Sequence, residues 1–237
     1  MKYLLKTDII FIDGKGVPHC GKTSFLLSKF EELLSEGADV SRILVLCPLS
    51  VKSRFTDIAA RGAGKGSGEL HIDSFSGFAK WALKKNSYQF TKSCDFTIIS
   101  GKEEEVVLKD ILSRAEVRKA LTNFSSCCAF RGFVSEAENF IDSYKINPST
   151  RLKADEFTIL SEYEKRLKER NLFDLRDVEQ RCLESAEGGF FSESFDYVFL
   201  DGWEDLNRKE CEIFIRLVEK AADLKGIYMA GDSSAGI

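Results

Sequence analysis

The residues best suited to chemistry are nine consecutive ones near the N-terminus, GVPHCGKTS, from Gly16 to Ser24. They satisfy the pattern G-x-x-x-x-G-K-[ST], in which glycines let backbone N–H groups wrap phosphates. In such a loop the lysine, here Lys22, neutralises the outer phosphate oxygens, and the hydroxyl of Thr23 ligates magnesium. The pattern therefore predicts a site for ATP and Mg²⁺ between a strand and a helix.

The expected nucleotide site takes in most of this stretch. We expect the nucleotide to contact the following loop and helix residues: Gly16, His19, Cys20, Gly21, Lys22, Thr23 and Ser24. His19 and Cys20 would also suit a metal or nucleophile pair, but filling the loop is the favoured interpretation. A later run, GAGKGSG, also has glycines and a lysine. Because Glu69 and a strand follow it instead of a helix, we interpret this run as a connector.

A second chemical feature is YVFLDGWEDL, Tyr197 to Leu206, an apolar run that ends in aspartate. A carboxylate at the end of a parallel strand can hold nucleotide-bound magnesium, so Asp201 is the expected partner of Thr23. We expect its strand to lie beside the strand that leads to Gly16. A general-base glutamate usually follows such an aspartate, but the next residue here is Gly202. With Lys22 and Asp201 as the catalytic candidates, Glu204 is a candidate substitute base.

Hydrophobic patterns predict the elements that position these residues. The run IIFID predicts a strand, and SFLLSKFEELLSEG predicts a helix because its apolar residues recur at helical spacing. The continuous apolar run RILVLCP is typical of a parallel strand buried on both faces. A polar stretch follows from Ser50, and then come a short strand candidate at 70–72 and a helix candidate at 75–84.

The pattern changes in the second half of the chain. From about residue 93 to 187 it is mostly helical, with no strong strand signal. Strand character returns at 197–200, and after a predicted helix at 208–222 the run GIYMAGD ends in Asp232. This order predicts an α/β fold, a parallel sheet flanked by helices, interrupted by a mostly α-helical inserted subdomain.

Composition excludes several classes of protein. The 237 residues are 43% hydrophobic and 30% charged, which suits a globular protein with a sizeable core. The sequence shows no apolar run of about 20 residues and no secretory signal pattern, so we expect a cytoplasmic protein without a membrane partner. Seven cysteines without a CxxC pattern argue against a disulfide framework or a zinc ribbon, and we expect reduced thiols, mostly in the core.

Charge gives a weaker signal. The net charge is −4, but basic residues outnumber acidic ones between Val51 and Phe90. A local basic surface in an acidic protein is compatible with a nucleic-acid backbone as partner, although chance clustering on a solvated surface explains it equally well.

Six motifs together resemble a known family. The segments GVPHCGKT, LCPLS, HIDSFSGF, NLFDLRDV, FLDGWEDLN and MAGDSS keep the order and approximate spacing found in the first RecA-like domain of UvrD/Rep-type superfamily 1 DNA helicases. The resemblance covers nearly the whole chain. It implies a RecA-like domain over 1–92 and 188–237 and a helical insertion over 93–187. It also implies ATP, Mg²⁺ and single-stranded or partly duplex DNA as ligands, with Asp232 opening the motif that borders the nucleotide.

The chain departs from the helicase pattern at several positions. Gly202 stands where the family has its general-base glutamate, Glu204 where it has glutamine, and Ala235 where it has a glutamine that senses phosphate. The Asp-Gly-aromatic form is most similar to the AddB/RexB subunits of helicase-nucleases, whose helicase fold is thought to serve DNA or recombination-signal recognition. We also find no second RecA-like domain with its arginine finger, so we expect hydrolysis to be impaired.

Three hypotheses follow for function. The first is a nucleotide-binding, DNA-interacting domain of a UvrD/Rep-like helicase or AddB-like exonuclease subunit in repair or recombination, with a second subunit or further domains as partner. The second is the N-terminal half of an active helicase, and the third is a kinase-like or signalling P-loop enzyme unrelated to DNA. By resemblance, Ser50 is an expected DNA-backbone contact and Phe75 a base-stacking residue. An aromatic that starts a helix, as Phe75 does, is more often part of the core.

Overall fold

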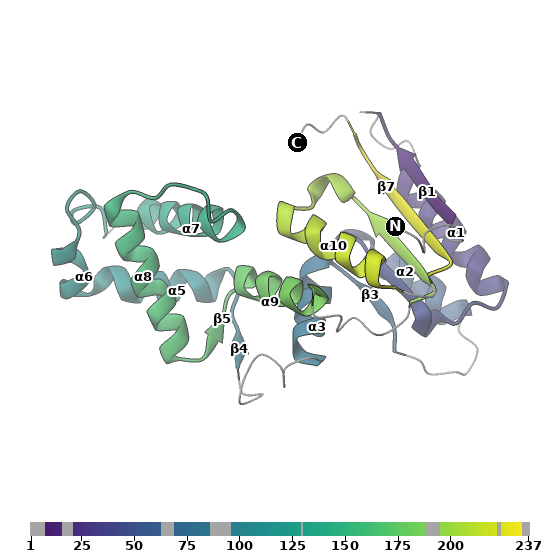
Figure 1. Ribbon diagram of the computed structural model, residues 1–237, viewed down its shortest axis with the longest axis horizontal. Coiled ribbons are helices and arrows are strands. Elements are labelled where there is room, and N and C mark those ends of the chain that lie inside the picture. The colour runs from purple at the N-terminus through teal and green to yellow at the C-terminus, as the bar shows by residue number, and fades with distance from the viewer. Residues whose placement is uncertain are drawn as a thin grey trace. The chain divides into compact units, whose positions relative to one another are not determined.

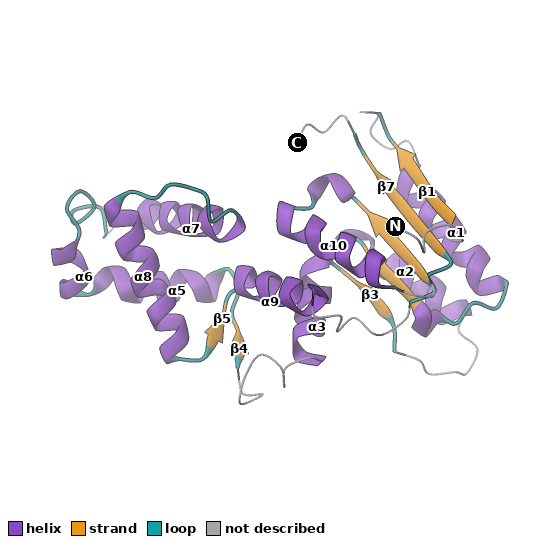
Figure 2. Ribbon diagram, in the orientation of Figure 1, coloured by secondary structure: helices purple, strands orange, loops and turns teal. Residues whose placement is uncertain are grey.

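The computed structural model describes residues 8–15, 21–62, 69–85, 96–128, 130–187, 195–221 and 224–233. The chain divides into two compact units, one formed by Met1–Lys85 with Cys182–Ile237 and the other by Asn86–Arg181. The sequence-predicted domain boundaries, at residues 92 and 187, remain a prediction. The first unit is α/β with a parallel sheet, which confirms the predicted fold class (Figures 1 and 2).

The first unit is built on a five-stranded parallel sheet in the order β1-β7-β6-β2-β3. Its strands are β1 (Asp8–Asp13), β2 (Ile43–Leu46), β3 (His71–Asp73), β6 (Tyr197–Asp201) and β7 (Gly226–Gly231). Strand β7 pairs with β1 on one side and β6 on the other. The expectation that the Asp201 strand adjoins the strand before the glycine loop was therefore wrong, because β7 lies between them.

Helices cover the two faces of this sheet. They are α1 (Lys22–Ser35), α2 (Leu49–Gly62), α3 (Phe75–Lys85) and α10 (Arg208–Lys220), with short 3₁₀ turns η2 (Val40–Arg42) and η3 (Trp203–Asp205). In Figure 1, α10 lies in front of the sheet, and α1 and α2 lie behind it. Helices α1 and α2 pack on the sheet through three fully buried aromatic rings, Phe30, Phe55 and Phe199, whose centroids lie 5.4–6.4 Å apart. Helix α2 occupies the stretch after Pro48 to which the sequence assigned no element.

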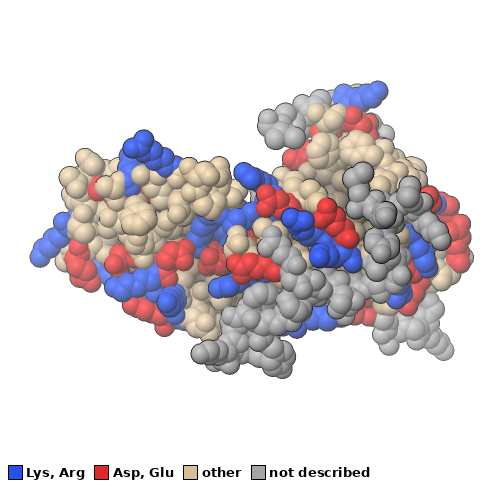
Figure 3. Space-filling model, viewed as in Figure 1, with Lys and Arg blue, Asp and Glu red and all other residues tan. Residues whose placement is uncertain are grey.

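The second unit is mostly helical, as predicted. It contains α5 (Lys102–Ser113), α6 (Ala115–Ala120), α7 (Arg131–Ile146), α8 (Ala154–Glu169) and the first residues of α9 (Leu175–Glu187). Two strands of two residues each, β4 (Thr97–Ile98) and β5 (Leu172–Phe173), form a parallel pair that the sequence did not predict. On the face drawn in Figure 3, uncharged side chains cover much of the region formed by α6, α7 and α8.

A buried lysine organises one end of this helical unit. The Nζ atom of Lys145 lies 2.6 Å from a carboxylate oxygen of Asp174, 2.9 Å from one of Asp177 and 2.6 Å from one of Glu164. Burial alone would lower the pKa of Lys145, but these carboxylates raise it above its ordinary value. The FDLRDV segment therefore supplies two of the three anions that hold this lysine, which links α7 to the start of α9.

Two further features of the described residues concern the cysteines and the length of the apolar helices. Within the described ranges the five cysteines are free thiols, three of them buried. None of the helices in the described part of the chain is long and apolar enough to cross a membrane.

Candidate nucleotide-binding site

The site centres on a contact between two residues that are far apart in the sequence. The hydroxyl of Thr23, in the first turn of α1, donates a hydrogen bond of 2.8 Å to Oδ2 of Asp201, at the end of β6. Asp201 is 9% exposed. The sequence pattern predicted that these two side chains would meet, and the structure brings them together although their elements are joined through β7.

Helix α1 presents its N-terminus to this contact. Its N-cap residue, Gly21, has a left-handed backbone with φ of 85°, which favours glycine, and among the described residues no side chain caps the first turn. The N–H groups of a helix start attract anions through their open donors and the helix dipole. Gly16, His19 and Cys20 lie outside the described residues, so the predicted contacts from the loop itself remain predictions.

Lys22 lies between two carboxylates at this edge of the sheet. Its Nζ is 3.8 Å from Oε1 of Glu204 and 3.9 Å from Oδ2 of Asp232. Its side chain passes close over Gly14, where an added Cβ would lie 2.5 Å from Nζ. Glycine at position 14 therefore gives the lysine room to reach the strand ends.

The donor set at Thr23 and Asp201 fits a magnesium ion. A hydroxyl and a carboxylate are the hard oxygen ligands that Mg²⁺ accepts, usually together with waters and substrate phosphates. Burial and the nearby charge of Glu204 raise the pKa of Asp201 above its ordinary value, although the hydrogen bond from Thr23 and the charges of Lys22 and Arg54 act in the opposite direction. When bound, Mg²⁺ would supply charge neutralisation for the phosphates, and Thr23 and Asp201 would hold it.

The turn after Asp201 has a conformation that suits glycine. Gly202 has φ of 77° and ψ of 45°, caps η3, and donates its N–H to the carbonyl of Ala230 at 2.8 Å. Trp203 follows and packs against Phe11 of β1, with ring centroids 5.6 Å apart. The indole also lies directly over Gly231, so a side chain at that position would overlap it. Trp203 therefore lies at the edge of the sheet formed by β1 and β7.

Two further residues of the site were not singled out from the sequence. Asp13, at the end of β1, accepts hydrogen bonds from the Ser233 side chain and backbone, and these bonds lower its pKa to about 2. Arg54 of α2 lines a groove of about 360 Å³ between α1 and α2 together with Ser24, whose side chain is exposed. The position of Asp13 at a strand end was a usable signal, whereas nothing in the sequence around Arg54 pointed to the site.

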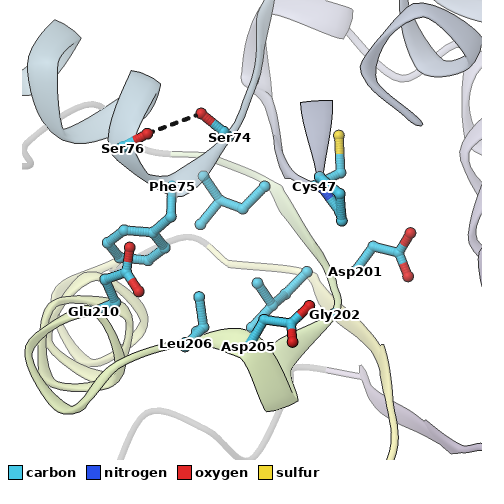
Figure 4. A pocket seen from close by; sticks show the side chains of 12 residues that line it. Cys47, Ser74, Phe75, Ser76, Asp201, Gly202, Asp205, Leu206 and Glu210 are labelled. Atoms are coloured by element: carbon cyan, nitrogen blue, oxygen red, sulfur yellow. Dashed lines mark hydrogen bonds between the residues drawn. The ribbon is translucent and has the colours of Figure 1, made fainter. Parts of the chain in front are cut away.

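A cavity of about 240 Å³ opens beside Asp201, on the side of β6 toward β2 and β3. Figure 4 shows Phe75 and Glu210 toward one side of this cavity and Asp201 toward the other, and Leu206 also lines it. Phe75 is 7% exposed, so it belongs largely to the core while one part of it reaches the cavity. Ser50, the second residue of α2, is exposed and does not line the cavity.

One comparison with known proteins is decisive. The family model described as the UvrD/REP helicase N-terminal domain matches residues 16–237. The chain belongs to this family. As a UvrD/REP helicase N-terminal domain, it is a helicase nucleotide-binding domain, and the family uses ATP and Mg²⁺ and binds DNA. No match was found among curated proteins.

Family membership places the observed geometry in context. The Thr23–Asp201 contact and Lys22 both lie within the range 16–237 that this family model matches. The residue after Asp201 is a glycine in a left-handed turn, which supplies no side chain. The carboxylate of this loop that pairs with Lys22 is that of Glu204, three residues after Asp201.

Proposed function

We propose that this chain is an ATP-binding, DNA-interacting helicase domain whose hydrolysis is impaired. The observation that carries the proposal is the 2.8 Å hydrogen bond between Thr23 and Asp201, because it joins the two expected metal ligands at the N-terminus of α1. Lys22 completes the site as the cation for the outer phosphates. The roles of Gly16, His19, Cys20, Gly21, Ser24 and Asp232 as further nucleotide contacts are part of this proposal.

The impaired hydrolysis rests on the turn at Gly202. A positioned general base contributes about 10²- to 10⁴-fold to rate, and glycine supplies none. Glu204 is the available carboxylate, but its Oε1 lies 3.8 Å from Lys22, and its Oε2 is buried without a hydrogen-bond partner among the described residues. In this arrangement the carboxylate of Glu204 is paired with the ammonium group of Lys22.

The DNA-binding part of the proposal places the single strand over the cavity beside Asp201. The ring of Phe75 reaches this cavity, and an aromatic stacked on a base contributes roughly 1–3 kcal/mol to binding. Ser50, exposed in the first turn of α2, is the proposed backbone contact. A cytoplasmic location and an AddB-like role beside a nuclease or second helicase subunit, in repair or recombination, are the finer form of this proposal.

A second candidate is the N-terminal half of an active helicase. One observation favours it: Glu204 is close enough to the phosphate lysine to turn toward the reacting centre once ATP displaces it. A kinase-like P-loop enzyme, the third hypothesis, gives no reason for a match to the helicase family over residues 16–237.

A nucleotide titration tests the proposal. The chain and its Lys22→Ala variant are titrated with ATP, with and without Mg²⁺ and single-stranded DNA, and phosphate release is followed in parallel. We expect Mg²⁺-dependent ATP binding that Lys22→Ala weakens at least tenfold, with little phosphate release even when DNA is added. Equal ATP affinity of the two proteins would refute the phosphate site, and robust DNA-stimulated release would favour the active helicase.

A further inference from the structure

The outer face of α3 carries a cluster of lysines that the nucleotide site does not use. Lys80, Lys84 and Lys85 line an open hollow of about 720 Å³ together with Trp81 and Gly77. Lys80 and Lys84 are four residues apart, so they lie on one face of the helix and roughly 6 Å apart along its axis. Neither of these two forms an ion pair or a hydrogen bond with residues in the described ranges.

The two acidic residues of the hollow are already engaged. Asp73 pairs with Lys52 of α2 at 2.8 Å, and Glu69 accepts a hydrogen bond of 2.9 Å from the indole of Trp81. Four lysines therefore face two carboxylates in this region, although the chain as a whole has a net charge of −4. On the face of the molecule drawn in Figure 3, basic and acidic side chains are interspersed instead.

Trp81, which is partly buried, already has several neighbours around its ring. Phe78 stacks on its ring with centroids 5.8 Å apart, and Nζ of Lys85 lies 5.0 Å above the ring centroid. His71 contacts the ring edge at 5.0 Å between centroids. Single-strand binding sites present aromatic faces on which bases stack. The half-buried Lys80 and the exposed Lys84 offer contacts to phosphates, whereas the Trp81 ring is already in contact with three side chains.

We propose that the outer face of α3 binds the phosphate backbone of duplex DNA through Lys80 and Lys84. This inference rests on the proposed function, in which DNA is the partner, and adds a duplex contact to the single-strand site at Phe75. Lys80 and Lys84 follow Phe75 by five and nine residues, which is roughly 7 and 14 Å along the helix. The two contacts therefore lie on one rigid helix, with the single strand at its start and the duplex along its side.

Salt-dependent binding of defined oligonucleotides tests this contact. The probes are a labelled mixed-sequence duplex and a labelled single strand, followed by fluorescence anisotropy at several salt concentrations. Each phosphate neutralised in a duplex adds about 0.9 to the slope of log affinity against log salt. We expect the Lys80→Ala/Lys84→Ala variant to lower the duplex slope by about 1.8 and the duplex affinity at 0.1 M salt by roughly 10- to 60-fold. The slope for the single strand should be unchanged.

A matched control is Arg216→Ala/Lys220→Ala, which removes two exposed charges one turn apart on α10. It should leave the duplex slope as it is, and thermal unfolding should show that both variants are folded. An unchanged duplex slope in the α3 variant, an equal loss in the control, or a loss confined to the single strand would each overturn the α3 assignment while leaving the ATP site intact. If the unmodified chain binds ATP but neither DNA probe, the DNA part of the proposed function fails as well.

Discussion

Gly202 stands at the expected general-base position, and its left-handed backbone conformation can be tested through its effect on the free energy of unfolding. Its φ of 77° is one that residues with a Cβ adopt at a cost of about 1–2 kcal/mol. An added Cβ would meet Asp205 and Pro48 at 3.6 Å, which is ordinary van der Waals contact. Because there is no steric clash, the backbone strain should account for nearly the whole effect of a Gly202→Ala substitution.

We therefore expect Gly202→Ala to lower the free energy of unfolding by about 1–2 kcal/mol. For a chain of this size that corresponds to a fall in Tm of about 2–8 °C. Gly202→Asn is the matched control, since asparagine tolerates the left-handed region better and should lose less. Urea denaturation of the three proteins measures the difference. An alanine variant as stable as the unmodified chain would refute the assigned conformation.

The same position can then be used to test catalysis. Gly202→Glu carries the same backbone strain as Gly202→Ala but adds the missing carboxylate. If the absent base limits turnover, the glutamate variant should hydrolyse ATP faster than the alanine variant, by up to the roughly 10²- to 10⁴-fold that a general base contributes. Equal rates for the two variants would show that another deficit is limiting.

Three further outcomes are expected. Thr23→Val removes the hydrogen-bond donor to the buried Asp201 carboxylate, so it should lower the free energy of unfolding by about 1–3 kcal/mol in urea denaturation. The same variant should abolish the Mg²⁺ dependence of ATP binding. Retained Mg²⁺ dependence would contradict the metal assignment. Lys145→Met leaves three carboxylates without their cation and should lower the free energy of unfolding by about 3–5 kcal/mol, which urea denaturation would detect. A loss below about 1 kcal/mol would contradict the buried network. Burial raises the pKa of Glu104 to about 7, so the folded state binds its proton more tightly and the free energy of unfolding should fall as pH rises from about 4.5 to 7. The Tm of Glu104→Gln should fall less than that of the unmodified chain across that interval. Parallel plots of Tm against pH for the two proteins would refute this.

Periodicity and motif spacing predicted the parts of the fold that have strong local signals. The helix after Gly21 and the buried strand before Pro48 were predicted because apolar residues recur with a clear period or form a continuous run. Helix α2 was not predicted because most of its residues are polar, so its three buried positions, Phe55, Ile58 and Ala59, do not give a clear helical period. The β4–β5 pair was missed because two residues are too few for any pattern.

The candidate site shows the same division. Thr23 and Asp201 could be paired from the sequence, since the loop pattern and the strand end each specify a role at one edge of a parallel sheet. The position of β7 between β1 and β6 could not be predicted, because strand order depends on packing between distant segments. The left-handed turn at Gly202 and the position of Arg54 likewise depend on contacts that no local pattern records.

The resting position of Lys22 has a consequence for how ligands enter. Its ammonium group is shared by Glu204, which follows β6, and Asp232, which follows β7. A triphosphate that bound this ammonium would compete with both carboxylates, so its binding would be an exchange of anions. The segments that carry Glu204 and Asp232 would then be free to move, so nucleotide binding alone, without ATP hydrolysis, would change the conformation of this edge of the sheet.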